Sequence, residues 1–240
     1  MLSDDSSARR GLIRLASLVL QPIAVAGYMG LPSVTASGHT GERAISAAIA
    51  LVEQAAKPIA IWGLPKLLST SATSITVAYP NQPPVEIPAN GRFFTEASSV
   101  LFILITLGEQ IDQLLANLYN EDDMLLAMAC DAAAAAAMSA AGAQCRQSCQ
   151  RALARRGLQM GTPYSPGCQV FPLTVQQQIF TLLTPASIGV SLSKECLMHP
   201  AKSVTNIAPV AANLPAWTQQ LNPCKLCSLR RSCTYKMVRG

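Results

Sequence analysis

Apolar positions along the chain predict helices and strands in alternation. Ile45, Ala48 and Val52 recur at helical spacing, and Pro58 follows them, so the pattern predicts an amphipathic helix that ends before this proline. The run VLFILIT, residues 100–106, is continuously apolar and rich in β-branched residues. Such a run is typical of a strand that is covered on both faces.

Two helices are expected directly after this strand. In LGEQIDQLLANL one helical face is apolar and consists of Ile111, Leu114, Leu115 and Leu118. Asp122 or Asp123 can cap a second, longer helix that runs through an alanine-rich tract to about Arg156, where Gly157 provides a stop signal.

Shorter elements follow in the last third of the chain. Thr174 and Gln177 form a T-x-x-Q capping box for a short helix that ends before Pro185, and residues 190–198 alternate as a half-buried strand does. Earlier, ITVAYPNQPPVEIP, residues 75–88, predicts an edge hairpin. The expected fold class is α+β, with helices packed on a mostly antiparallel twisted sheet.

Composition narrows the class of protein. The chain has 240 residues, 50% of them hydrophobic and 13% charged, which suits one domain with a large core and excludes disorder. The net charge is +5, but the cations are spread thinly, so no nucleic-acid partner is expected. Residues 124–142 are mostly alanine and include Asp131, which favours a buried helix over a membrane span.

The chain start and the eight cysteines bear on location. Arg9 and Arg10 precede an apolar stretch as in an export signal, but Arg14 and Pro22 interrupt that stretch. Eight cysteines in a chain of this size do not resemble a small disulfide scaffold, so reduced thiols in the cytoplasm are expected. The predicted organisation is a flexible start (1–17), one α+β domain (18–215) and a cysteine-rich tail (216–240).

The order of three motifs carries a resemblance. FILITLGEQID is followed by the alanine-rich helix, then by YSPGCQVFPLTVQQQIFTLL, then by IGVSLSKECLMHPAKSVTNI. This order resembles the activation domain of vitamin B12-dependent methionine synthase, and still more the stand-alone form of that domain with a C-terminal cysteine cluster. The resemblance covers roughly residues 18–236 and is strongest over residues 164–207.

The resemblance implies a C-shaped domain that binds S-adenosylmethionine and holds it against a cobalamin. Inactive cob(II)alamin there receives one electron and then the methyl group of the sulfonium, a reaction that depends on proximity. The chain has no D-x-H-x-x-G cobalamin-attachment motif. The implied partner is therefore a corrinoid-binding methyltransferase that carries the cobalamin in trans.

The ligand motif of the family reads R-x-x-P-G-Y-x-x-x-P. Aligned on the Pro-Gly pair, this chain has Pro163 in place of the arginine and Cys168 in place of the tyrosine. A proline cannot replace a guanidinium clamp on a carboxylate. The resemblance nevertheless marks one segment as cofactor-binding: Tyr164, Ser165, Pro166, Gly167 and Cys168.

A second candidate segment is the hairpin-like corner in LMHPAKSV. In the family an M-x-P segment lies near the cobalamin, and here Met198, His199 and Pro200 occupy it. His199 is either a cobalt ligand or, as we favour, a turn histidine in water. Lys202 either meets the edge of the corrinoid or is solvated, and we favour solvation.

Cysteines in the tail have the spacing of metal ligands. Cys224, Cys227 and Cys233 form a C-x2-C-x5-C pattern that suits zinc or an iron–sulfur cluster. The fourth ligand would be Cys168, Cys196 or a residue other than cysteine. A cluster would provide a route for the single electron. The alternative is a set of reduced thiols or a disulfide.

Cysteines and methionines of the long helix are expected to have structural roles. Cys145 and Cys149 share a helix face and are expected in the core, as are Met124, Met128 and Met138. Asp131 must point to water or meet a partner, because an unpaired carboxylate on an apolar face is costly.

Two functions stay open at this point. One is an accessory protein that reactivates a corrinoid methyltransferase by S-adenosylmethionine-dependent methylation. The other is a non-catalytic corrinoid-protein-binding or electron-transfer module that has lost S-adenosylmethionine binding.

Overall fold

The structure is a computed structural model that describes residues 9–121, 123–220 and 231. The strands are β1 (Arg10–Arg14), β2 (Ile59–Gly63), β3 (Lys66–Thr70), β4 (Ser74–Ala78), β5 (Val85–Pro88), β6 (Ser99–Thr106), β7 (Gln159–Met160), β8 (Ser191–Leu192), β9 (Met198–His199) and β10 (Ser203–Ala211). The α-helices are α1 (Pro22–Tyr28), α2 (Gly38–Ala55), α3 (Glu109–Asn120), α4 (Met124–Ala154), α5 (Gln176–Leu183) and α6 (Ala216–Gln220).

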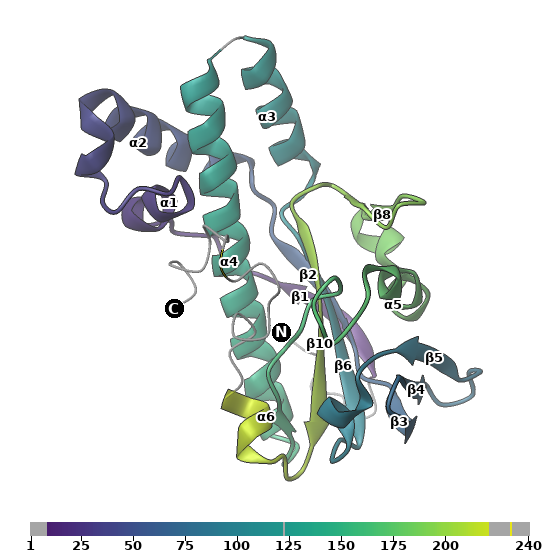
Figure 1. Ribbon diagram of the computed structural model, residues 1–240. Coiled ribbons are helices and arrows are strands. Elements are labelled where there is room, and N and C mark those ends of the chain that lie inside the picture. Colours follow the sequence, from purple (N-terminus) through teal and green to yellow (C-terminus); the bar gives the residue numbers. More distant parts are fainter. Residues whose placement is uncertain (1–8, 122, 221–230, 232–240) are drawn as a thin grey trace.

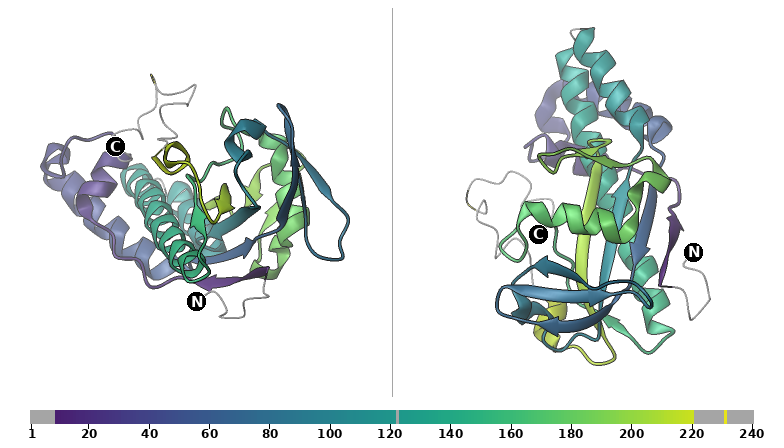
Figure 2. Two further views of the ribbon diagram at one scale, coloured as in Figure 1. Left: turned by 90° about the horizontal axis from the view of Figure 1, so that it is seen from below. Right: turned by 90° about the vertical axis from the view of Figure 1, so that its right-hand side faces the viewer.

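A curled antiparallel sheet separates two layers (Figures 1 and 2). The helices α1 to α4 cover one face, whereas α5 and the strands β3 to β5 lie over the other. Strand β6 is central: β10 pairs with one side of it, and β2 and then β3 pair with the other side. The predicted fold class, α+β with helices on an antiparallel sheet, is confirmed.

Strand β6 explains the continuously apolar run. Val100, Phe102 and Leu104 point into the core beneath α5, and Leu101 and Ile103 point into the core beneath α4. All eight residues of the strand are buried. The prediction of a strand covered on both faces is confirmed.

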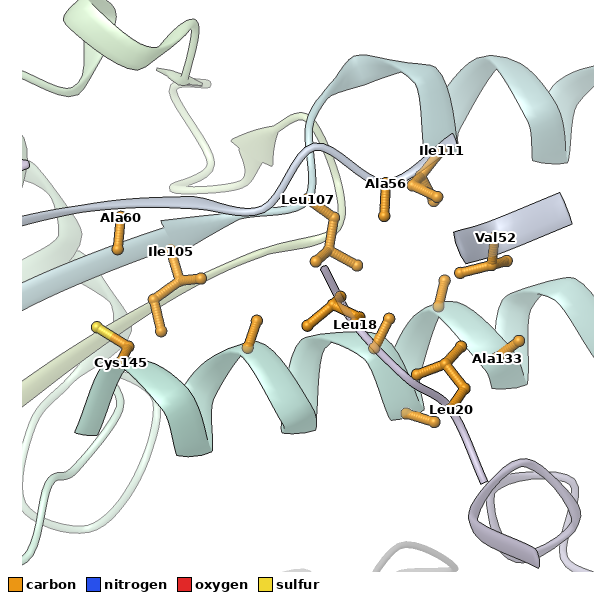
Figure 3. Packing of buried hydrophobic residues seen from close by; sticks show 14 of the residues in the cluster. Leu18, Leu20, Val52, Ala56, Ala60, Ile105, Leu107, Ile111, Ala133 and Cys145 are labelled. Atoms are coloured by element: carbon orange, nitrogen blue, oxygen red, sulfur yellow. The ribbon is translucent and has the colours of Figure 1, made fainter. Parts of the chain in front are cut away.

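Helix α4 is the core helix of the other layer. Its alanines let the helix approach the sheet closely, and Figure 3 shows Ala133 in one cluster with Leu18 and Leu20, with Cys145 near Ile105. The helix is long and apolar enough to cross a membrane, but half of its most apolar window is buried inside the protein. Its composition is accounted for by packing.

The ends of α4 follow local signals. The Asp123 carboxylate accepts a hydrogen bond from the backbone N–H of Leu126 at 3.2 Å, so the predicted cap is present. The helix ends at Ala154, two residues before the predicted end, and Gly157 follows with φ +67°. Cys145 and Cys149 are buried in the core as predicted.

Several expectations need correction in the outer parts of the fold. Part of the expected flexible start is strand β1, which pairs with β2 over five residues. Part of the expected tail is helix α6, where the Thr218 carbonyl accepts from the Thr162 N–H at 2.7 Å. Met124 and Met128 are each 54% exposed, so they are not core residues.

Helix α5 begins differently from the prediction. The turn Leu173–Val175 is a 3₁₀ helix, and the residue before α5 makes no side-chain capping bond. The capping box of Thr174 and Gln177 is therefore wrong, because the 3₁₀ turn occupies the position where the box would form. The edge hairpin is confirmed, since β4 and β5 pair antiparallel at the end of the sheet.

Candidate functional site

The predicted ligand loop lies along the outer edge of β10. Tyr164 and Ile207 exchange two backbone hydrogen bonds, of 2.9 and 2.8 Å. The Ser165 hydroxyl donates to the Asn206 side-chain oxygen at 3.2 Å. These three bonds fix the loop in register with one strand, and Asn206 is a site neighbour that the sequence did not mark.

The Pro166–Gly167 turn is present as expected. Gly167 has φ +91°, a conformation that glycine adopts at little cost, and its N–H donates to the Phe171 carbonyl at 2.9 Å. The Val170 N–H lies 3.4 Å from the Cys168 sulfur, so the thiol is turned back onto its own turn. The turn is therefore held by hydrogen bonds among its own residues.

The phenol of Tyr164 points into the core. Its ring packs edge-on against Phe93, with centroids 5.3 Å apart, and the residue is 3% exposed. Burial, with a smaller contribution from Cys168, raises the pKa of Tyr164 to about 12, so the phenol is protonated at neutral pH. Its hydroxyl is buried and has no hydrogen-bond partner among the described residues.

The second predicted segment is held by two helices. Asp112 on α3 accepts the N–H of Ala201 at 2.7 Å, and Asp131 on α4 lies 2.8 Å from the Lys202 ammonium. The expectation that Lys202 is solvated is therefore corrected: it makes an ion pair. His199 is exposed at the end of β9.

The hairpin turn lies earlier than the sequence suggested. Ser193 accepts the N–H groups of Glu195 and Leu197 at 3.2 Å each, and Cys196 has φ +63°. The bend of the β8–β9 hairpin is thus at residues 193–197, and Pro200 follows the hairpin, after a cis peptide bond, as the entry to β10. The predicted continuous strand over residues 190–198 is wrong for this reason.

The two predicted segments are connected by one strand. The corner at Lys202 leads into β10, and the loop pairs with β10 at Ile207, four residues beyond Ser203. At about 3.3 Å per residue, Ser203 and Ile207 lie roughly 13 Å apart along the strand. Between them the buried Thr205 hydroxyl donates to Gln176 on α5 at 2.9 Å, so this stretch of β10 is fixed from the α5 side.

The predicted metal ligands are mostly residues that the structure does not describe. Cys224, Cys227 and Cys233 are outside the described residues. Within the described part of the chain, no three His, Cys, Asp or Glu side chains gather as a metal site. Cys196 is buried in the hairpin turn and Cys168 is half-buried, and a role for either as a fourth ligand stays a prediction.

Similarity to known proteins rests on structure. No protein-family model matches the chain, and no curated protein matches it in sequence. Among solved structures, the chain is similar to the one titled "Crystal Structure of the MetH Reactivation Domain bound to AdoHcy", with a TM-score of 0.60 and 14% sequence identity. The match covers 95% of this chain and 87% of that one, so the two share a fold over nearly their whole length.

Proposed function

We propose that this protein is an accessory protein for a corrinoid-dependent methyltransferase such as methionine synthase. It acts on cobalamin that the partner carries, and it uses S-adenosylmethionine as the methyl donor. The observation that carries the proposal is the attachment of the 164–168 loop to β10 by the Tyr164–Ile207 pair, in a fold shared with the MetH reactivation domain.

In this reaction the protein positions the methyl donor and the cobalamin, and none of its own residues reacts covalently. Cob(II)alamin takes one electron from a reductant, and the reduced cobalt then attacks the sulfonium methyl, which leaves S-adenosylhomocysteine. Holding two reactants in line can lower the barrier to such a transfer by about 7–11 kcal/mol. Ser165 in the loop and Asn206 on β10, which are hydrogen-bonded to each other, present a hydroxyl and an amide group suited to the polar part of the methyl donor.

The fastening of the corner suits a partner surface. The ion pair of Lys202 with Asp131 and the bond of Asp112 to Ala201 fix the backbone beside exposed His199. A fixed backbone loses little freedom when another protein docks. We assign this corner, with Met198 and His199, to contact with the corrinoid-bearing partner, and the buried Pro200 supports it from within.

A second candidate is a corrinoid-protein-binding or electron-transfer module that no longer binds S-adenosylmethionine. One specific observation favours it: the Tyr164 phenol is buried in the core, so it does not stand in for the tyrosine that Cys168 replaces. Pro163 likewise provides no guanidinium. Under this hypothesis the tail cysteines Cys224, Cys227 and Cys233 carry a zinc ion or an iron–sulfur cluster.

Calorimetry of the full chain with S-adenosylmethionine and with S-adenosylhomocysteine separates the two candidates. Micromolar binding that Asn206→Ala weakens about tenfold supports the methyl-donor function. The matched control is Gln54→Ala, an exposed amide on α2. Absence of heat at millimolar ligand rejects methyl donation and leaves the module.

A direct assay follows the cobalamin. A cob(II)alamin-loaded methionine synthase is mixed with a reductant and S-adenosylmethionine labelled on its methyl carbon, with and without this protein. Transfer of label to the cobalamin that depends on this protein supports the proposal. Label that stays on S-adenosylmethionine while the protein binds the partner in sedimentation supports the module, and neither binding nor transfer rejects both.

A further inference from the structure

A cavity of about 210 Å³ lies at the edge of the sheet away from β10. It is formed where β1 and β2 meet the end of α5 and the turn after it, and Arg10, Leu12, Ile61, Leu183 and Ser187 line it together with Gly11 and Trp62. Strands β2 and β6 separate β1 from β10. This cavity is therefore distinct from the site proposed above.

The walls of the cavity are apolar. Leu12 on β1 is paired in register with Ile61 on β2, so both side chains stand on the α5 face of the sheet. Leu183, at the end of α5, approaches from above. Leu12 is 48% exposed, although its neighbours Ile61 and Leu183 are buried. Covering Leu12 with an apolar ligand would remove apolar surface from water and so favour binding.

Arg10 places a fixed cation at this wall. Its guanidinium carbon lies 3.8 Å from the centroid of the Tyr79 ring, and Nη2 donates to the Gln82 side-chain oxygen at 2.7 Å. A guanidinium has five N–H donors in a planar fork, which suits a carboxylate. Stacking and one hydrogen bond thus orient the cation and leave donors for a ligand.

Tyr79 supports the Arg10 guanidinium from beneath. Its hydroxyl is buried, lies against Gly63 and near Leu183, and has no hydrogen-bond partner among the described residues. Burial raises the pKa of Tyr79, and the nearby Arg10 guanidinium opposes this shift only in part. The phenol is protonated at neutral pH, and the Tyr79 ring lies behind the cavity lining, where it supports the Arg10 guanidinium.

We propose that this cavity binds a small carboxylate with a short branched or linear apolar chain. The carboxylate pairs with the Arg10 guanidinium, and the chain covers Leu12, Ile61 and Leu183. A cation is excluded because Arg10 is the charged group at the wall. The volume of about 210 Å³ suits a small ligand.

The test uses the full chain and three probes: 4-methylpentanoate, its neutral isostere 4-methylpentanamide, and acetate. Amide shifts in NMR spectra identify the site, and titration gives the affinity. We expect 4-methylpentanoate to shift the amides of Gly11, Leu12 and Ser187. 4-Methylpentanamide and acetate are each expected to bind about tenfold more weakly, because 4-methylpentanamide lacks the charge and acetate lacks the apolar chain.

Variants separate the charge from the apolar wall. Arg10→Gln and Leu12→Asp are each expected to weaken 4-methylpentanoate binding about tenfold or more. The matched control is Arg14→Gln, an exposed arginine on the same strand that does not line the cavity, and its affinity should stay within about twofold of the parent.

Three results would overturn the proposal. The first is unchanged backbone N–H signals of Gly11, Leu12 and Ser187 at tens of millimolar 4-methylpentanoate. The second is equal affinity for 4-methylpentanoate and 4-methylpentanamide. The third is an equal loss of 4-methylpentanoate affinity in Arg10→Gln and Arg14→Gln. Folding of each variant is checked by its unfolding midpoint, and Tyr79→Phe provides a second variant that keeps the ring under Arg10. Binding of S-adenosylmethionine does not enter these outcomes.

Discussion

The Nζ atom of Lys202 lies 2.8 Å from Oδ1 of Asp131, an ion pair between the entry to β10 and the N-terminal third of α4. The side chains are 20% and 44% exposed, so water screens the pair only in part. Asp112 holds the neighbouring Ala201 from α3 at 2.7 Å. Two helices that are distant in sequence from β10 thus set the position of the corner that we assign to the partner.

The ion pair can be measured with a double-mutant cycle. We expect a coupling free energy of about 0.2–1 kcal/mol between Asp131→Ala and Lys202→Ala, because the pair is partly exposed. Urea unfolding of the parent, the two single variants and the double variant gives this value, and about 1 M NaCl should reduce it. A coupling that is zero, or that salt leaves unchanged, contradicts the ion pair.

Asp112→Ala should be more costly than loss of the ion pair. The Ala201 N–H would lose a charged acceptor, and such bonds contribute about 1.5–3 kcal/mol. Hydrogen exchange at the Ala201 amide should accelerate, which a general loss of helix stability would not confine to this residue. Glu109→Ala, an exposed acid in the same helical turn, is the control. Equal exchange at Ala201 in both variants would disprove the contact.

Local patterns predicted the elements of the core well. The strand at 100–106 was predicted because a continuous apolar run indicates burial on both faces. The helix from Met124 was predicted because its capping residue, Asp123, directly precedes it. Strand β1 was missed because it has arginine at both ends and only Ile13 is buried, so its alternation is too short to stand out. Its pairing with β2 depends on residues about 50 positions away.

The site shows the same limit. The Pro166–Gly167 turn was predicted from its residues, but Asn206 was not, because its link to Ser165 arises only when the loop pairs with β10. Asp131 was singled out as needing water or a partner, yet nothing near it in sequence identifies Lys202. The direction of the Tyr164 side chain also depends on the register of that pairing.

Gly63→Ala tests the close packing beside the cavity. A Cβ at this position would meet the Tyr79 hydroxyl and come within 2.8 Å of Leu183 Cδ2. Overpacking of this kind costs about 1–3 kcal/mol, and we expect that loss in urea unfolding. In a Tyr79→Phe background the loss should shrink, because the hydroxyl is gone.

Gly142→Ala is the matched control for this substitution. Nothing lies within 4 Å of the added Cβ, and the residue is inside α4, so the change should stabilise by about 0.5–1 kcal/mol. A neutral Gly63→Ala, or an equal loss with and without the Tyr79 hydroxyl, would contradict the packing.

Cys130 makes the stability of the protein depend on alkaline pH. Burial, with a smaller contribution from the Asp123 carboxylate, raises the pKa of the Cys130 thiol from 9.0 to about 11. Between these values the unfolded chain loses a proton that the folded chain keeps, so the free energy of unfolding falls as pH rises. The contribution is complete below about pH 9 and lost by about pH 11, a change on the order of 2 kcal/mol.

Urea unfolding at several pH values from 8 to 11.5 measures this slope. Cys130→Ala should flatten the curve over the window between the two pKa values, because alanine does not titrate. Ala133→Gly, a buried control on the same helix, should lower the curve by the same amount at every pH. Other buried thiols such as Cys149, whose pKa is raised by its hydrogen bond with Cys145 and by burial, leave a residual slope in both variants. If Cys130→Ala and Ala133→Gly give parallel curves, the thiol of Cys130 is exposed to solvent and the packing of α4 on the sheet must differ at this position.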